Sequence, residues 1–158
     1  MELIVDGYNV MHGVPEWRAM EKQSLAEART TIERRLALYR AKHPSVAILL
    51  YWDGDRDVTR SRPSRVHGIS VIFTQSGADG AIIGRVQASR NPKQVTVVTD
   101  DRALAEAIEG AGASVIPVEQ LAKRLTELGD DPGRRAKLRP DTGEGKKITD
   151  DLKDVWGA

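Results

Sequence analysis

Aspartates recur in this 158-residue sequence where apolar runs end, or where the segment after such a run begins. They are Asp6, Asp53, Asp79, Asp100 and Asp101. Carboxylates that converge on one place repel one another, so they ionise together only when a cation is close by. Oxygen donors without His or Cys select hard ions such as Mg²⁺ or Mn²⁺, which most often act on phosphate esters. The residue types therefore indicate metal-dependent phosphate chemistry, provided that the fold brings them together.

The apolar runs that precede these aspartates are short and continuous, which is typical of strands buried on both faces. They occupy residues 3–5, 46–52, 69–73, 95–98 and 114–116. Segments with a helical spacing of apolar residues separate them, so strand and helix alternate along the chain. This alternation predicts an α/β fold in which helices cover both faces of a parallel sheet. The carboxyl ends of parallel strands meet at one edge, so the aspartates are expected to share it.

A helix is expected to begin at Ser24, because Ser24 and Glu27 fit a capping box. Its apolar stripe consists of Leu25, Ala28, Ile32, Leu36 and Tyr39. The basic residues on its outer face favour a solvated helix surface over a phosphate-binding track. They are Arg29, Arg34, Arg35, Arg40 and Lys42. Residues 11–22 are predicted to form a loop, since Gly13 and Pro15 interrupt any periodicity.

Each aspartate also has a structural interpretation. Asp79 and one of the pair at 100–101 could be helix caps, and Asp6 and Asp53, each followed by Gly, could be turn formers. For one residue alone, the structural and functional interpretations carry equal weight. For several aspartates at the ends of neighbouring strands, the functional interpretation is favoured.

Composition excludes several classes of protein. The formal net charge is +1, so no global basic field indicates a nucleic-acid partner, and any such signal must be local. There are no cysteines, which excludes disulfides and thiolate chemistry. No apolar run is long enough to span a bilayer, and the N-terminus does not resemble a signal peptide, so a cytoplasmic location is expected. His12 and His67 stand alone, and surface or structural roles are favoured for them over metal ligation.

The composition changes at residue 129, where charge, proline and glycine become frequent. Residues 1–128 are therefore predicted to form one domain, and residues 129–158 a charged, partly flexible C-terminal extension. Basic and acidic residues balance in this extension, so it is no polybasic tail. Residues 149–156 could form a short helix, with disorder as the competing interpretation.

Four short motifs resemble those of one known family. Residues 3–10, Leu-Ile-Val-Asp-Gly-Tyr-Asn-Val, resemble the first motif of the YacP-like NYN domains, a group within the PIN-like nuclease superfamily. Trp-Asp-Gly at residues 52–54 stands where that group carries an aspartate after its second strand. Residues 73–83 resemble its block with an Ala-Asp pair entering a helix, and residues 97–102 resemble its Thr-Ser-Asp motif. The resemblance covers about residues 1 to 128, and the order of the four motifs makes it specific.

The resemblance implies a fold and an activity. The fold would be a three-layer α/β/α PIN-like domain with a five-stranded, mainly parallel sheet in the order 3-2-1-4-5. The activity would be that of an endoribonuclease that cleaves RNA phosphodiester bonds with Mg²⁺ or Mn²⁺. Carried over to this sequence, Asp6, Asp79 and Asp101 would face the metal, and Asp53 would support them. Asn9 would fix the first loop or touch the substrate.

Two positions depart from the family's pattern. Gly80 follows Asp79 where the family usually has a larger residue, which loosens the start of the expected helix. Asp100 occupies the position of the family's serine, and its extra charge could belong to a metal ligand, a supporting residue or an exposed side chain. Asp101 keeps the register of the family's aspartate and is therefore favoured as the ligand.

A local basic segment follows the second expected strand, at the same edge as the aspartates. Its arginines are Arg56, Arg60, Arg62 and Arg65. They could hold the phosphates on either side of the scissile bond or form a solvated loop, and the sequence favours neither. Aromatic rings would also be expected to stack on unpaired bases, for which Tyr8 and Trp17 are the candidates near this edge. Tyr51 and Trp52 are expected in the core.

Two rival functions share this set of residues. A non-catalytic RNA-binding module would use the arginines, with the aspartates acting only as caps. A Mg²⁺-dependent phosphatase is suggested by Asp53-Gly54-Asp55, but the sequence lacks the downstream lysine expected of one, and Asp53 follows the second strand rather than the first. The sequence leaves open the RNA target, the oligomeric state, and whether a ribosome or another large assembly presents the substrate.

Overall fold

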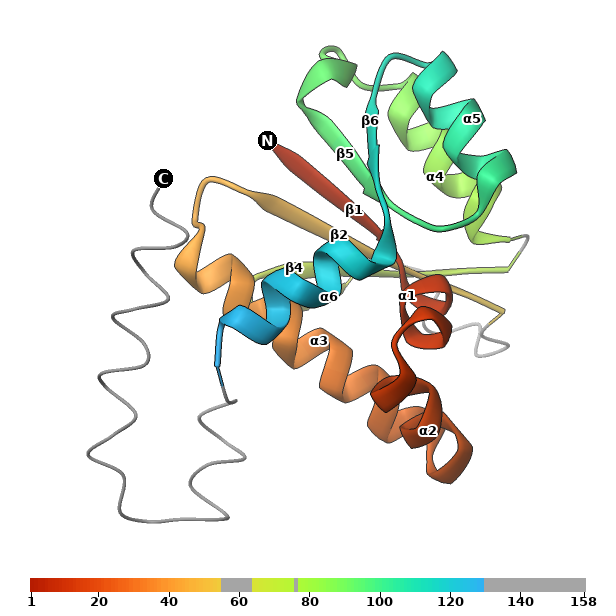
Figure 1. The fold of residues 1–158 in the computed structure, drawn as a ribbon. Helices are drawn as coiled ribbons and strands as arrows, with labels where there is room; N and C mark the ends of the chain where they lie inside the picture. The colour runs from red at the N-terminus through yellow and green to blue at the C-terminus, as the bar shows by residue number, and fades with distance from the viewer. Residues whose placement is uncertain (55–63, 76, 130–158) are drawn as a thin grey trace.

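One sheet with helices on both faces makes up the computed structural model, which describes residues 1–54, 64–75 and 77–129 (Figure 1). Its strands are β1 (Glu2–Asp6), β2 (Ala47–Asp53), β3 (Ser64–Val66), β4 (Ile69–Thr74), β5 (Val95–Val98) and β6 (Ser114–Ile116). Its helices are α1 (Gly7–Gly13), α2 (Pro15–Gln23), α3 (Leu25–Lys42), α4 (Ala78–Gln87), the short 3-10 helix η2 (Pro92–Gln94), α5 (Arg102–Gly110) and α6 (Val118–Glu127). The predicted α/β fold is confirmed.

The sheet has the strand order β3-β4-β2-β1-β5-β6 among the described residues. The predicted strands correspond to β4, β2, β1, β5 and β6, which are parallel and lie in the predicted order. The prediction of five strands was incomplete, because β3 adds an antiparallel edge strand beside β4. His67 and Gly68 form the turn between them, with φ angles of 50° and 87°. Two successive residues with positive φ suit a tight β-hairpin turn, but the dipeptide His-Gly is a weak sequence signal for such a turn.

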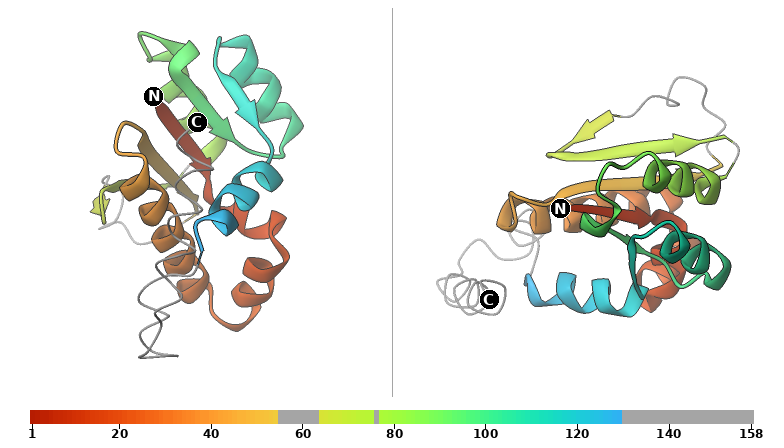
Figure 2. Two further views of the ribbon diagram at one scale, coloured as in Figure 1. Left: turned by 60° about the vertical axis from the view of Figure 1, so that its left-hand side comes forward. Right: turned by 90° about the horizontal axis from the view of Figure 1, so that it is seen from above.

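The side chains of β1 alternate between the two faces of the sheet. Leu3 and Val5 lie in the core cluster formed with α2, α3 and α6, whereas Ile4 lies in the cluster formed with α4 and α5. Figures 1 and 2 show α3 and α6 on one side of the sheet and α4 and α5 on the other. The position of a residue within its strand therefore decides which helices its side chain meets.

The predicted loop at residues 11–22 is wrong, because this part of the chain is helical. α1 follows β1 without a turn, and α2 starts with Pro15. Proline is tolerated at the first helical position, where its fixed φ suits the helix and its missing N–H is not needed. Gly13 and Pro15 thus mark the boundary between two short helices. Trp17 is buried and holds α2 against the core.

α3 begins where the capping signal predicted. The Ser24 hydroxyl accepts a hydrogen bond from the Glu27 N–H at 3.2 Å. The predicted stripe is buried from Ala28 onward, at Ala28, Ile32, Leu36 and Tyr39. Leu25 is an exception with 39 % of its surface exposed, because it is the first residue of the helix and lies beyond the core.

Two arginines of α3 do not lie on the solvated face that was predicted for them. Arg35 donates hydrogen bonds to the carbonyl oxygens of Leu125 and Gly129, the latter at 2.6 Å. These carbonyls lie at the C-terminal end of α6, where a cation is favoured by the helix dipole. Arg29 is half-buried, with its guanidinium against the ring of Tyr8. Both arginines stand three or four residues from members of the apolar stripe, a spacing that brings side chains together on a helix.

Parts of the predictions fall outside the described residues. The C-terminal extension from residue 130, including the helix considered at residues 149–156, is not described, and neither are residues 55–63 of the basic segment. Within the described ranges, every helix is too short or too polar to cross a membrane.

Candidate active site at the carboxyl edge of the sheet

The alternation of side chains along β1 and β2 places two aspartates on one face of the sheet. Ile4 and Tyr51 lie in the core cluster of α4 and α5, and Asp6 and Asp53 follow them by two residues. Residues two apart in a strand project to the same face, so both carboxylates project to the side of α4 and α5. Asp6 ends β1 and pairs in register with Tyr51, two residues before β2 ends at Asp53.

Two further aspartates start the helices that cover this face. Asp79 lies in the first turn of α4, and Asp101 is the N-cap of α5. The Asp101 carboxylate accepts a hydrogen bond from the Leu104 N–H at 3.1 Å, and the Asp101 N–H donates to the Thr99 hydroxyl at 3.1 Å. The capping role considered for Asp101 is therefore present. It occupies one carboxylate oxygen and fixes the side chain at the edge of the sheet.

Asp6 is the buried member of this set, with 7 % of its surface exposed. Its pKa is raised from 3.8 to about 6, first by burial and then by the negative charges of Asp79, Asp101 and Asp53, while the Asn9 backbone N–H acts in the opposite direction. Burial, followed by the charges of Asp101 and Asp53, also raises the pKa of Asp79. The structure thus brings together four of the predicted aspartates. We call Asp6, Asp53, Asp79 and Asp101 the acidic group.

The acidic group has the donor chemistry of a site for a hard divalent cation. All its donors are carboxylate oxygens, and the charged side chains that shift the pKa of Asp6 are all negative. Within the described residues, no three His, Cys, Asp or Glu side chains lie close enough together to ligate a single ion. Mg²⁺ commonly binds through one or two carboxylates and keeps several waters. The arrangement therefore fits a partly hydrated Mg²⁺ or Mn²⁺ better than a closed cage of protein ligands.

Asp100 lies apart from the acidic group, on the opposite face of the sheet. Val98 belongs to the core cluster of α3 and α6, and Asp100 follows it by two residues. The Asp100 carboxylate accepts a hydrogen bond from the Val118 N–H at 2.9 Å, at the first residue of α6. The side-chain oxygen of Asn9 accepts one from the Asp100 N–H at 2.7 Å. Asn9 thus ties α1 to the loop that carries Asp101, and the structure does not bring Asp100 to the other predicted ligands.

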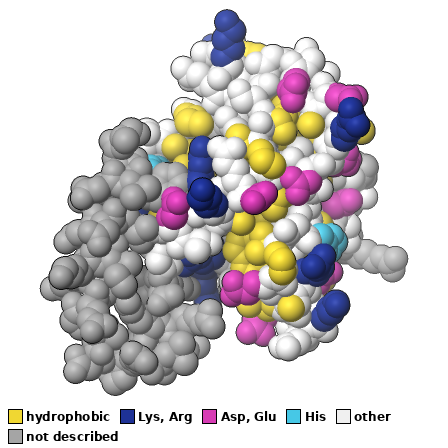
Figure 3. Space-filling model, in the orientation of Figure 1, with side chains coloured by type: hydrophobic (Ala, Val, Ile, Leu, Met, Phe, Trp, Pro, Cys, Tyr) yellow, Lys and Arg dark blue, Asp and Glu magenta, His cyan; other side chains and the backbone are white. Residues whose placement is uncertain are grey.

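The predicted RNA-binding arginines are not brought to the acidic group in the described structure. Arg56, Arg60 and Arg62 lie outside the described residues. Arg65 is exposed on β3 and pairs with Ser70, four residues before the end of β4. A strand rises about 3.3 Å per residue, so Arg65 lies about 13 Å from the carboxyl edge at which it was expected. On the face shown in Figure 3, the described Lys and Arg side chains form separate spots.

A comparison with family models identifies the group to which this arrangement belongs. The model of the YacP-like NYN domain matches residues 3–155. The chain belongs to the YacP-like NYN domain family. A curated relative, the uncharacterized protein YacP of Bacillus subtilis (strain 168), is 30 % identical over 129 residues, which are 80 % of this chain and 75 % of YacP. The resemblance drawn from the four motifs is confirmed, and the family match extends past the domain boundary predicted at residue 128.

Solved structures with the same fold come from the same relative. A crystal structure of Rae1 (YacP) from Bacillus subtilis aligns with a TM-score of 0.70 at 25 % identity, covering 98 % of this chain and 85 % of that one. A mutant of Rae1 (YacP) aligns with a TM-score of 0.68 at 23 % identity, covering 98 % of both chains. The NYN domain has a PIN-like nuclease fold, so the family supports a nuclease-type role for this YacP-like domain.

Tyr8, predicted to contact RNA, is half-buried in a cluster of rings on the α3 side of the sheet. Its ring lies edge-on to Trp52, with 5.1 Å between the centroids. The Arg29 guanidinium lies 5.5 to 5.7 Å from the ring centroids of Tyr8, Trp52 and Phe73, and it donates a hydrogen bond to the Tyr8 hydroxyl. The stacking role considered for Trp17 is wrong, because only 6 % of that residue is exposed. Sequence reasoning missed Arg29, which closes this ring cluster.

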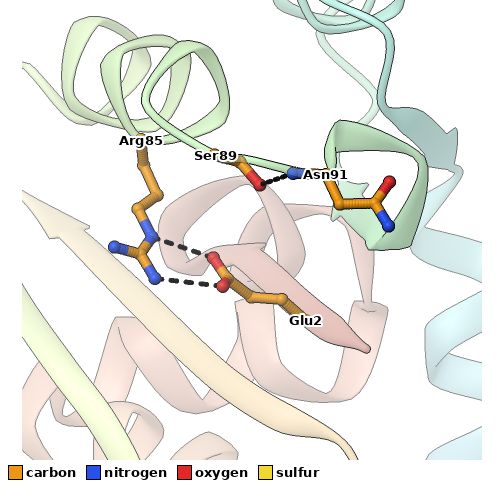
Figure 4. Close-up of polar contacts among 4 residues, drawn as sticks. All are labelled: Glu2, Arg85, Ser89 and Asn91. Atoms are coloured by element: carbon orange, nitrogen blue, oxygen red, sulfur yellow. Dashed lines mark hydrogen bonds and ion pairs between the residues drawn. The ribbon is translucent and has the colours of Figure 1, made fainter.

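The amino-terminal end of the sheet carries a carboxylate in a different environment. Glu2 begins β1 and binds Arg85 of α4 through two hydrogen bonds, from Nε at 2.9 Å and from Nη2 at 3.0 Å (Figure 4). These bonds raise the pKa of Arg85. Close by, the Asn91 N–H donates to the Ser89 hydroxyl at 3.3 Å. In this YacP-like domain, the edge opposite the acidic group is therefore stabilised by paired polar groups.

Proposed function

We propose that this protein is a divalent-metal-dependent endoribonuclease that hydrolyses RNA phosphodiester bonds at the acidic group. The observation that carries the proposal is Asp6, a buried carboxyl with a pKa raised to about 6 by burial and by three neighbouring carboxylates. Ionising such a group disfavours folding, so its presence calls for a functional reason. Membership of a family with a PIN-like nuclease fold supports the same function.

The four residues of the acidic group would have different roles. Asp6, together with Asp79 and Asp101 at the starts of α4 and α5, would hold a partly hydrated cation, one or two of them directly and the others through its waters, and Asp53 would add negative charge beside them. When bound, Mg²⁺ or Mn²⁺ would activate a water and stabilise the leaving oxygen of the phosphate. Asn9 would position Asp101, because its side-chain oxygen accepts a hydrogen bond from the N–H of Asp100, the residue before Asp101.

Cleavage of a single-stranded RNA by the full chain, with Mn²⁺ or Mg²⁺ present, tests this proposal. We expect Asp6→Asn to lower kcat by at least about a hundredfold, because electrostatic groups at a reaction centre have effects of this size. Glu2→Gln is the matched control at the other end of β1, and it should cleave within about twofold of the wild type. Equal cleavage by the wild type and Asp6→Asn would overturn the assignment.

A non-catalytic RNA-binding module is the second candidate. It is favoured by the spacing of the aspartates, since no three possible ligands meet at one point among the described residues. Titration with Mn²⁺, followed by thermal unfolding, separates the two. A nuclease site should stabilise the fold by about 1.4 kcal/mol at a Mn²⁺ concentration ten times the Kd. A binding module without a metal site should unfold at the same temperature with and without millimolar Mn²⁺.

A further inference from the structure

Few rings are available to an RNA base in the described part of the chain. The buried rings are those of Trp17, Tyr39, Tyr51 and Trp52. Tyr8, Phe73 and His43 are half-buried, so the rings on exposed residues are those of His12 and His67. His67 lies in the turn that precedes β4, at the end of the sheet away from the acidic group. His12 lies on α1, which begins at the carboxyl edge.

His12 is the outermost of three rings in contact, which lead from the buried Trp52 through Tyr8 to the surface. We call these three rings the ring ladder. Trp52 is fully buried, and Tyr8 lies edge-on to it at 5.1 Å. His12 stacks on Tyr8 with 6.1 Å between the centroids and 30° between the planes. These two residues are four apart on α1, so they share one side of the helix. The side chain of His12 is 55 % exposed, so the outer end of the ladder meets solvent.

Contacts with two helices hold this ring ladder in place. The His12 Nε2 atom lies 2.9 Å from a carboxylate oxygen of Glu21 on α2. Tyr8 accepts a hydrogen bond from Arg29 on α3. A ring that is already oriented loses less conformational freedom when a ligand binds. His12 is therefore a preorganised flat surface on the α3 side of the carboxyl edge, whereas the acidic group projects to the α4 and α5 side.

The distance along α1 links His12 to the acidic group. α1 starts at the residue after Asp6, and six residues of helix rise about 9 Å. An RNA strand that crosses the carboxyl edge would thus extend past His12. We propose that His12 is a stacking site for an unpaired RNA base that flanks the phosphate bound at the acidic group. Histidine is among the side chains on which unstacked RNA bases stack. This inference rests on the proposed function.

The test uses the full chain and single-stranded RNA oligonucleotides. We expect His12→Ala to raise the KM for cleavage about tenfold with kcat within about twofold, in line with the loss of one base–ring stack. His12→Phe keeps a ring and should retain the wild-type KM. Glu16→Gln removes an exposed carboxylate from the same helix α2 and leaves the contacts of His12 in place, so it is the matched control, with a KM within about twofold of the wild type. An equal rise in KM for His12→Phe and His12→Ala would overturn the proposal.

An abasic RNA completes the comparison. Removal of the flanking base should raise the KM about tenfold for the wild type and not for His12→Ala, because the variant has no stack to lose. Equal losses in both proteins would contradict stacking. If the wild type cleaves no RNA, the proposed function fails, and binding then decides the stacking proposal separately. A 2-aminopurine at the flanking position should be quenched by the wild type and not by His12→Ala, and equal quenching would refute it.

Discussion

Two carboxylates on strand β1 lie in opposite environments. Glu2, at the amino end, accepts two hydrogen bonds from Arg85 at 2.9 and 3.0 Å. Asp6, at the carboxyl end, is buried beside three other aspartates, and its pKa is raised to about 6. The two residues are four apart in the strand and project to the same face. Their difference therefore comes from their neighbours at the two ends of the strand and not from the face to which they project.

This difference separates a carboxylate that stabilises the fold from one for which we propose a function. A paired carboxylate favours the folded state, whereas a buried carboxylate among like charges disfavours it once it ionises. Natural proteins break the rules of stability mainly at functional sites. The division also follows the parallel sheet, in which ligands bind beyond the carboxyl ends of the strands. The amino end of β1 carries a stabilising ion pair, and its carboxyl end carries the acidic group that we propose binds a cation.

Asp6→Asn is the change with the largest expected effect on this contrast. Between pH 3.8 and about 6 the folded protein holds a proton at Asp6 that the unfolded chain has released. The free energy of unfolding therefore falls as pH rises through this range and stays lowered above it. The rise in pKa corresponds to about 3 kcal/mol. We expect Asp6→Asn to be about 3 kcal/mol more stable than the wild type at pH 8 without metal, and to lose most of this gain at pH 4, as measured by urea unfolding.

Asp79→Asn is the companion variant for this measurement. The pKa of Asp79 is raised by partial desolvation and by the charges of Asp101 and Asp53, but this residue is more exposed than Asp6. We expect the same direction of pH dependence with a smaller amplitude. If the stability difference between Asp6→Asn and the wild type is the same at pH 4 and pH 8, the buried carboxyl does not oppose folding.

The fold and the acidic end of this contrast could be predicted from the sequence, whereas the pairing of Glu2 with Arg85 could not. Continuous apolar runs that end in Asp predicted parallel strands with acids at one edge, and the motifs predicted the strand order. The capping box at Ser24 located the start of α3. These signals are local, since each depends on the types and spacing of neighbouring residues, and the fold agrees with them.

The face of the sheet to which an individual side chain projects could not be predicted in the same way. Asp100 and Asp101 are adjacent, and a shift of one residue at the end of a strand moves a side chain to the other face. Only the three-dimensional structure shows that Asp100 meets the Val118 N–H while Asp101 joins the acidic group. The helices α1 and α2 were missed for another reason. Gly13 and Pro15 interrupt the apolar period as a loop would, although each helix is packed against the core.

Gly7→Ala tests how tightly the chain is packed next to Asp6. Its expected effect on the free energy of unfolding is the second largest. A Cβ at Gly7 would lie 2.6 Å from Cζ3 of Trp52 and 2.7 Å from the carbonyl oxygen of Tyr51. Because one neighbour is backbone, the clash cannot be relieved by a side-chain rotation alone. We expect a loss of about 1–3 kcal/mol in the free energy of unfolding, together with reduced RNA cleavage, since Asp6 is the preceding residue.

Gly80→Ala provides the control for this substitution. Gly80 lies in α4 next to Asp79, and no atom lies within 4 Å of the site of an added Cβ. Alanine is favoured over glycine in a helix by up to about 1 kcal/mol, so this variant should be slightly stabilised. If Gly7→Ala is as stable as Gly80→Ala, the packing of α1 onto Trp52 does not restrict the position of Asp6.

Glu2→Gln has the smallest expected effect and tests the paired end of β1. The side chains of Glu2 and Arg85 are 20 % and 48 % exposed, so solvent and salt screen their attraction. Pairs of this kind contribute about 0.2–1 kcal/mol, and we expect Glu2→Gln to lower the free energy of unfolding by no more than that. The loss should shrink in 1 M NaCl, because the Debye length falls to about 3 Å. An increase in stability like that of Asp6→Asn would show that the Arg85 pair does not offset the charge of Glu2, and the two ends of the strand would then be alike.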